Sequence, residues 1–198
     1  MKTMNTYFYR AYIIVLLFAI GLNGFGQSKK IEKTYRWKQE VNEYVNFSFN
    51  NYDCDLIIHT WDKSEIEYSM SVDAILKSEE DASRLDAYIE ELEFSQSNGG
   101  SKFDNRFWTS KKAVLGRKTI TLKGERTIRY SEFKMKGELW IPENCNLTFQ
   151  SKYSEIMADD LNGRVSLDLY NDNLFGGLVN SNMEIRAKYS TLEFKDMK

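Results

Sequence analysis

The chain has 198 residues with 27 basic and 29 acidic side chains, which gives a formal net charge of −2. This length excludes an array of several large domains and leaves room for one domain with a substantial core. The near-neutral charge is ordinary for a soluble protein, and any histidine-dependent catalysis would have to depend on the single histidine.

The first 26 residues have the composition of a secretory leader. A basic start is followed by an apolar run of 12 residues at 11–22 and by small residues that end at Gly26. We expect this signal peptide, residues 1–26, to be cleaved before Gln27, because a membrane span needs about 20 apolar residues. An uncleaved anchor is the alternative. The protein is therefore expected to be exported, to the periplasm, the outer-membrane surface or the extracellular medium.

Short segments of alternating apolar and polar residues dominate the rest of the chain. Alternation with period two is typical of half-buried strands, because successive side chains point to opposite faces of a sheet. The clearest segments are 45–50, 65–72, 118–122, 127–141, 147–149 and 165–169. The chain is therefore predicted to be mainly β.

One segment, 78–94, has helical spacing instead. Its apolar residues Ala82, Leu85, Ile89 and Leu92 recur at intervals of three and four. Ser78 at its start is suited to cap the first turn. The spacing predicts an amphipathic helix that lies with its apolar stripe against the sheet.

The C-terminal part of the chain contains a repeat of 18 residues. Two Lys-Tyr-Ser phrases, at 152–154 and 188–190, lie 36 residues apart, which is two repeats. The shift of 18 also aligns four apolar columns: Leu147, Val165 and Met183; Phe149, Leu167 and Ile185; Ile156, Leu174 and Leu192; Leu161, Val179 and Met197. One such turn cannot bury its apolar face alone, whereas stacked turns bury it against their neighbours.

The same apolar spacing occurs 100 residues earlier, at Phe47, Phe49, Leu56 and Trp61. We therefore predict a mainly β fold, a β-solenoid of the parallel β-helix type with 18-residue rungs, one inserted amphipathic helix and extra antiparallel strands. The predicted parts of this single domain, 27–198, are an opening rung at about 47–64, a helix and strand insertion at about 65–142, and further rungs at about 143–198.

Three segments carry a family resemblance: "NFSFNNYDCDLIIHTWDKSEIEYSMSV" at 46–72, "LWIPENCNLTF" at 139–149, and the Lys-Tyr-Ser repeats. With the helix between them, they resemble the uncharacterised adhesin-like β-strand-repeat domains exported by Gram-negative bacteria. The resemblance covers most of the chain after residue 26. It implies a β-solenoid in an exported, envelope-associated protein, and it carries over no activity, cofactor or catalytic residue. Such domains usually continue for several more rungs.

The sequence offers little that could support catalysis or hold a cofactor. His59 follows an apolar strand segment without a nucleophile at a suitable spacing, so a satisfied strand histidine is expected. The motifs CxxC, HExxH and GxGxxG and the phosphate loop are absent. The glycine-rich nonapeptide of calcium-binding coils is missing. Four aspartates could still recruit Ca²⁺: Asp159, Asp160, Asp168 and Asp172. We predict no catalytic site, no cofactor and no metal.

The two cysteines, Cys54 and Cys145, each precede an apolar strand segment. Export would permit a disulfide between them, but sequence does not place the two residues within bonding distance. Two buried or partly buried free thiols are the favoured interpretation, and one disulfide is the alternative.

Charge is unevenly distributed along the chain. Residues 39–93 hold 15 acidic and 3 basic residues, whereas residues 101–136 hold 11 basic and 3 acidic ones. A basic block with interleaved aromatic residues suggests nucleic acid, but export argues against that partner. An anionic glycan or lipid surface fits better, and lysines that blunt exposed strands are the structural alternative. The possible surface-contact residues are Trp108, Lys111 and Lys112, together with Tyr153 and Tyr189, which could equally form a structural ladder.

The functional prediction is a non-enzymatic exported envelope protein, an adhesin-like module that contacts an unknown envelope, glycan or protein ligand. One alternative is a polysaccharide-active enzyme of the parallel β-helix type, which needs clustered carboxylates. This alternative is disfavoured, because Glu155 aligns with Asn173 and Thr191 and not with a second acidic residue. Another is a structural or regulatory envelope module. Because the last predicted rung closes at Met197 without a cap, we expect either a fragment of a longer coil or a C-terminal edge that stacks on another copy or on a partner.

Overall fold

The structure, a computed structural model, describes residues 28–97, 100–124, 126–179 and 182–197. The predicted leader lies outside these residues. The elements in chain order are β1 (Lys29–Glu40), β2 (Asn46–Tyr52), β3 (Asp55–Trp61), β4 (Glu65–Leu76), α2 (Glu79–Glu90), β5 (Ser95–Ser97), β6 (Gly100–Asp104), β7 (Trp108–Val114), β8 (Arg117–Leu122), β9 (Thr127–Pro142), β10 (Asn146–Lys152), β11 (Glu155–Ala158), β12 (Val165–Tyr170), β13 (Asn173–Val179), β14 (Met183–Lys188) and β15 (Thr191–Met197).

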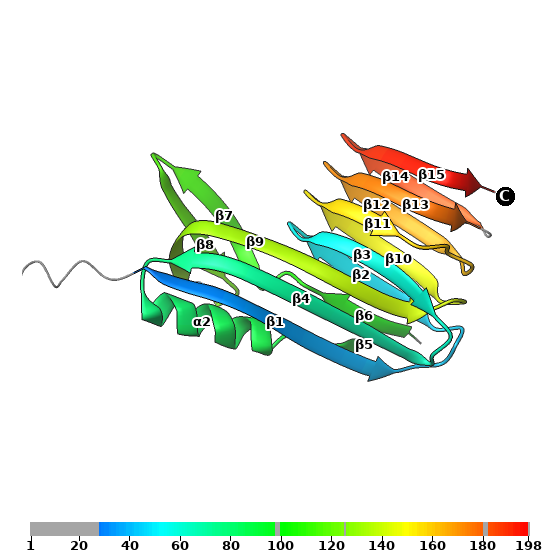
Figure 1. The fold of residues 1–198 in the computed structure, drawn as a ribbon, viewed down its shortest axis with the longest axis horizontal. Coiled ribbons are helices and arrows are strands. Elements are labelled where there is room, and N and C mark those ends of the chain that lie inside the picture. Colours follow the sequence, from blue (N-terminus) through cyan, green and yellow to red (C-terminus); the bar gives the residue numbers. More distant parts are fainter. Residues whose placement is uncertain (1–27, 98–99, 125, 180–181, 198) are drawn as a thin grey trace, which may run out of the picture.

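The described strands form two sheets (Figure 1). One is nine-stranded with the order β1-β4-β9-β3-β11-β13-β15, and the β7–β8 hairpin joins it where β8 pairs with β9. The other is six-stranded with the order β14-β12-β10-β2-β6-β5. Strands β2, β10, β12 and β14 belong to the six-stranded sheet, and the strand that follows each of them belongs to the nine-stranded sheet. A tight corner connects the two strands of each such pair.

The predicted β-solenoid is wrong as a description of this fold. The chain forms two mixed, largely parallel sheets with one helix among the described residues. Long antiparallel strands make up much of the larger sheet: the 12-residue β1 and β4 pair along their full lengths, and β4 also pairs with the 16-residue β9. An apolar repeat specifies the register between successive repeats, but it says nothing about strands that lie outside it.

The register predicted from the repeat is confirmed. Val165 lies opposite Leu147 on one side and Met183 on the other, in parallel pairs. The earlier match at a shift of 100 also holds, because Phe47 pairs with Leu147 and β3 pairs with β11. Parallel pairing at this register places like side chains above one another, so each apolar side chain is covered by the equivalent side chain of the neighbouring repeat.

The core lies between the two sheets and is rich in aromatic rings. Phe49 stacks on Phe149 with ring centroids 6.0 Å apart and meets Tyr68 edge-on at 4.9 Å. On β12, Val165, Leu167 and Leu169 are buried. The residue between the last two, Asp168, is exposed. The alternation predicted from sequence therefore decides which side chains enter this core.

The predicted helix is present as α2. Ser78 caps it, since its Oγ accepts a hydrogen bond from the backbone N–H of Asp81 at 3.1 Å. Ala82, Leu85 and Ile89 are buried, and the helix packs on β1, β4 and β9. This helix covers part of the larger sheet, and no described helix is long and apolar enough to cross a membrane.

Both cysteines are buried free thiols, as the sequence favoured. Burial raises the pKa of each thiol to about 12, because the thiolate would lose its hydration. Neither thiol is therefore activated as a nucleophile.

Candidate binding surface

Four tight corners connect the two sheets, and each one places a residue in the left-handed backbone region. The φ angles are +56° at Asp53, +62° at Tyr153, +55° at Asn171 and +58° at Tyr189. Neighbouring corners are hydrogen bonded, because the N–H of Tyr153 donates to the carbonyl of Tyr170 and the N–H of Asn171 donates to that of Lys188. The repeated Lys-Tyr-Ser phrase is therefore the sequence of a corner.

Tyrosine is an unusual choice for such a corner. Asp and Asn tolerate the left-handed region, whereas a bulky side chain has a steric cost of about 1–2 kcal/mol there. Tyr153 and Tyr189 do not regain this cost by burial, since their side chains are 58% and 71% exposed. Backbone strain that the fold does not need is an indication of function.

Tyrosines and lysines alternate along the strand ends beside these corners. The last residues of β2, β10, β12 and β14 are Tyr52, Lys152, Tyr170 and Lys188, and each is paired with the next. We call these four residues, together with Tyr153 and Tyr189, the Tyr–Lys ridge.

The rings and cations of the ridge are in contact. Tyr170 meets Tyr153 and Tyr189 edge-on, with ring centroids 5.9 and 5.7 Å away. The Nζ atoms of Lys152 and Lys188 each lie 5.8 Å from the centroid of Tyr170, within the range of a cation–π contact. The ridge is therefore an ordered row of aromatic faces and ammonium groups on the surface.

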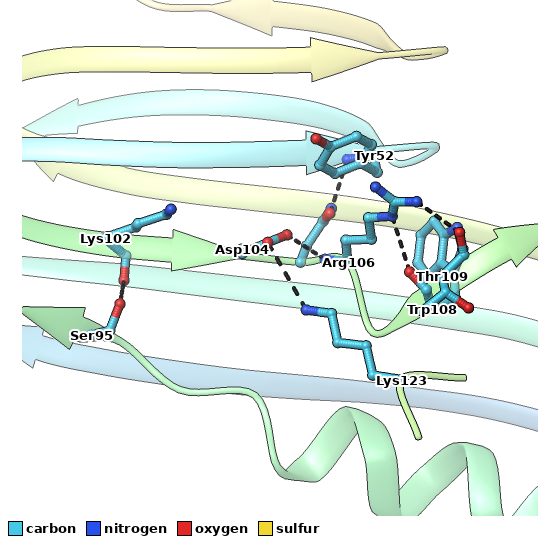
Figure 2. A network of polar contacts seen from close by, with 9 residues as sticks. Tyr52, Ser95, Lys102, Asp104, Arg106, Trp108, Thr109 and Lys123 are labelled. Atoms are coloured by element: carbon cyan, nitrogen blue, oxygen red, sulfur yellow. Dashed lines mark hydrogen bonds and ion pairs between the residues drawn. The ribbon is translucent and has the colours of Figure 1, made fainter. Parts of the chain in front are cut away.

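Arg106 extends the cationic row at the β2 end. Its guanidinium lies 4.9 Å from the Tyr52 ring centroid. Figure 2 shows how it is held: Nε donates to the carbonyl of Trp108 at 3.0 Å and Nη2 to that of Thr109 at 2.8 Å. The backbone N–H of Tyr52 donates to Asn105 Oδ1 at 2.9 Å. These contacts fix the arginine relative to the ridge before any ligand arrives.

The structure brings together two of the residues that the sequence selected as possible contacts, since Lys111 Nζ lies 5.9 Å from the Trp108 ring centroid, and it places the two tyrosines separately. Tyr153 and Tyr189 lie on the ridge, and Lys111 forms an ion pair with Asp53 at the first corner. Lys112 is exposed on β7, away from that ion pair, whereas Trp108 is buried and packs against Phe107.

Sequence reasoning missed the residues of the ridge that flank the tyrosines. Lys152, Tyr170 and Lys188 recur at the 18-residue spacing, so the repeat contained the signal. These positions show no apolar periodicity, so the apolar columns of the repeat do not reveal them.

A ladder of buried polar side chains lies beneath the ridge. Asp172 Oδ1 accepts from the Ser151 hydroxyl at 3.1 Å and the Ser154 N–H at 2.9 Å, and Oδ2 accepts from the Tyr170 N–H at 2.8 Å. Burial raises the pKa of Asp172 although these hydrogen bonds oppose the shift. Asp172 thus supports the corner from inside and does not face a ligand.

The raised pKa of Asp172 predicts a pH effect on stability. The native carboxyl holds its proton more tightly than the unfolded one, so its contribution is fully present below the ordinary pKa of 3.8 and is lost as the pH rises through the native pKa. The unfolding free energy of the wild type minus that of Asp172→Ser should therefore fall between about pH 3.5 and neutrality. Urea unfolding at several pH values measures it, and a difference that rises with pH would contradict the assignment.

A groove of about 730 Å³ lies on the outer face of the nine-stranded sheet. Met157, Phe175 and Phe194 are among its lining residues, together with the acidic residues Asp159, Asp160 and Glu193. Just beside it His59 stacks on Trp140 at 4.1 Å, and its Nδ1 lies 3.0 Å from Asp159 Oδ2. His59 is thus a hydrogen-bonded strand residue, as expected.

Within the described ranges, no group of three or more potential ligands is placed to hold a metal.

Comparison with known proteins gives only distant structural likenesses. No family model matches the sequence, and no curated protein matches it significantly. A "putative cell adhesion protein" from Clostridium sporogenes is similar over 86% of this chain and 100% of its own, with 13% identity and a TM-score of 0.42. A "putative lipid binding protein" from Parabacteroides distasonis is similar over 83% of this chain and 61% of its own, with 13% identity and a TM-score of 0.33. These likenesses are distant, and they assign the chain to no family.

Proposed function

We propose that the protein is a non-enzymatic exported module that acts by surface contact, and that the Tyr–Lys ridge binds an anionic glycan. The observation that carries this proposal is the exposure of Tyr153 and Tyr189 at left-handed corners, each next to a lysine. These tyrosines are costly for the backbone and remain in water, so contact with a partner accounts for them better than folding does.

The chemistry of the ridge suits a linear anionic polymer. Aromatic faces offer flat apolar area to sugar rings, and lysine ammonium groups form charge-assisted hydrogen bonds with carboxylate or sulfate groups. Neighbouring strands lie about 4.8 Å apart, so Tyr153 and Tyr189, two strands apart, are roughly 10 Å from each other. A chain that runs along the ridge would meet rings and cations in alternation.

Two features support a role in binding in preference to catalysis. Asp172, the carboxylate beneath the ridge, is buried and its oxygens already accept three hydrogen bonds. His59 Nδ1 lies 3.0 Å from Asp159 Oδ2, so this ring nitrogen is already hydrogen bonded. A glycan hydrolase would need two accessible carboxylates on either side of the bound sugar.

Calorimetric titration with polygalacturonate, and with dextran as a neutral control, tests the proposal. We expect binding to the anionic polymer only, with an affinity that falls as salt is added. Lys152→Gln with Lys188→Gln should weaken it at least fivefold, since each removes a charge-assisted contact. Equal binding to both polymers, or none to either, would contradict the proposed ligand class. Shortened polymer after incubation would instead indicate the polysaccharide-active enzyme.

A further inference from the structure

The tip of the β7–β8 hairpin carries an apolar side chain that the fold leaves in water. Val114 lies opposite Arg117, so Leu115 and Gly116 form a two-residue turn with φ angles of +48° and +75°. The Leu115 side chain is 98% exposed and that of Val114 is 61% exposed. In Figure 1 this hairpin projects from the body of the nine-stranded sheet.

Leucine is a poor choice for this turn on local grounds. Two-residue turns with positive φ at both central positions favour Asn-Gly, Asp-Gly or Gly-Gly, because a branched side chain is strained there. Gly116 follows this preference and Leu115 does not. Leu115 is therefore strained and exposed at once, the same combination that marks the tyrosines of the ridge, but at a separate place in the fold.

Basic residues surround this apolar tip. The segment 111–118 reads "KKAVLGRK", with four basic residues and no acidic one. Lys111 is paired with Asp53, and the Lys118 Nζ donates to the Ser131 carbonyl at 3.1 Å. Lys112 and Arg117 are exposed, and no carboxylate in the described part of the chain forms an ion pair with either of them. Their charge is thus available to an anionic partner.

We propose that this hairpin docks on an anionic lipid bilayer, with Leu115 below the headgroups and Lys112 and Arg117 at the phosphates. Val114 lies at the level of Arg117, and the long arginine side chain reaches back from there to the phosphates. Lys112 lies three positions before Leu115, a distance of about 10 Å along an extended chain. This matches the depth of roughly 5–10 Å at which interfacial segments bury apolar side chains. The paired hairpin also leaves few backbone groups without partners on insertion. Cations on both strands favour a flat anionic surface over a pocket in another protein.

An environment-sensitive fluorophore at the tip reports insertion directly. Leu115→Cys in the full-length chain can be labelled with nitrobenzoxadiazole selectively, because Cys54 and Cys145 are buried. Tyr44→Cys, in an exposed turn between β1 and β2, is the matched control for a label distant from the hairpin. Because the signal is local, any contribution of the N-terminal segment to vesicle binding does not imitate it.

With vesicles of phosphatidylglycerol and phosphatidylcholine, the label at 115 should shift to the blue and brighten, whereas the label at 44 should not. Vesicles of phosphatidylcholine alone should give no shift. A label at 115 that stays in water on anionic vesicles would overturn the proposal, and a protein pocket would then be the better explanation for Leu115.

Unlabelled variants test the two components separately. Leu115→Asn suits the turn and should fold at least as well as the wild type, yet the tip's contribution to partition into anionic vesicles should fall at least tenfold with the loss of a buried leucine. Lys112→Gln with Arg117→Gln should lower partition by about fivefold per charge, and added salt should reduce this difference. Tyr153→Asn with Tyr189→Asn should leave partition unchanged. Partition of Leu115→Asn equal to that of the wild type would overturn the inference.

Discussion

Leu167→Asp is expected to abolish cooperative folding. Leu167 is only 4% exposed and lies between Phe149 and Ile185 in the parallel register. A carboxylate there would have no partner, and burying an unpaired charge costs several kcal/mol, a large fraction of the stability of a domain of this size. Urea unfolding followed by circular dichroism should show no sigmoidal transition for this variant.

The adjacent residue supplies the matched control. Asp168 lies on the same strand but faces solvent, so Asp168→Ala should change the unfolding free energy by less than about 0.5 kcal/mol. If the two substitutions had equal effects, the assignment of inward and outward faces on β12 would be wrong.

Asn51→Ala should have the second largest effect, a loss of about 3 kcal/mol or more. The Asn51 side chain is completely buried, and its Nδ2 lies within hydrogen-bonding distance of the Cys54 carbonyl at 2.8 Å and the Ser154 hydroxyl at 3.0 Å. Its Oδ1 accepts from Asn105 Nδ2 at 2.8 Å. Removal of the amide takes these hydrogen bonds from the Cys54 carbonyl and from Asn105 Nδ2, each of which then has a desolvation cost, whereas the Ser154 hydroxyl still donates to the Lys152 carbonyl.

Asn50→Ala separates this network effect from a general loss of asparagine. Asn50 is the preceding residue on β2 and is only partly buried. Its replacement should shift the midpoint of urea unfolding very little. A similar loss of stability in both variants would show that the strand, and not the buried ladder, determines the effect.

The sequence predicted the local elements and the register well, but not the architecture. The column that contains Leu147 and Val165 predicted parallel pairing, and the spacing of Leu85 and Ile89 predicted the helix. Period-two alternation in β1, β4 and β9 identifies strands, but it does not distinguish a parallel neighbour from an antiparallel one. The two-sheet arrangement depends on those long pairings between distant segments.

The candidate surface could be predicted only in part. Tyr153 and Tyr189 were visible because they recur at twice the 18-residue period of the repeat. The left-handed backbone that makes them unusual appears only in the folded corner, as does the strained Leu115. For Trp108 the prediction failed in the other direction. Its position in a basic block suggested a surface contact, but tertiary packing buries it.

The most direct measurement for the proposed function combines stability and binding in one double variant, Tyr153→Asn with Tyr189→Asn. Asn occupies the equivalent corner at position 171, so both substitutions suit the backbone. Relief of left-handed strain, about 1 kcal/mol at each corner, should offset the lost edge contacts with Tyr170, which are worth a similar amount.

We therefore predict an unfolding free energy within about 1 kcal/mol of the wild type, together with at least a tenfold loss of affinity for polygalacturonate. This combination would show that the tyrosines serve contact and not folding. A large loss of stability with unchanged affinity would contradict the proposal and make the Tyr–Lys ridge a structural ladder.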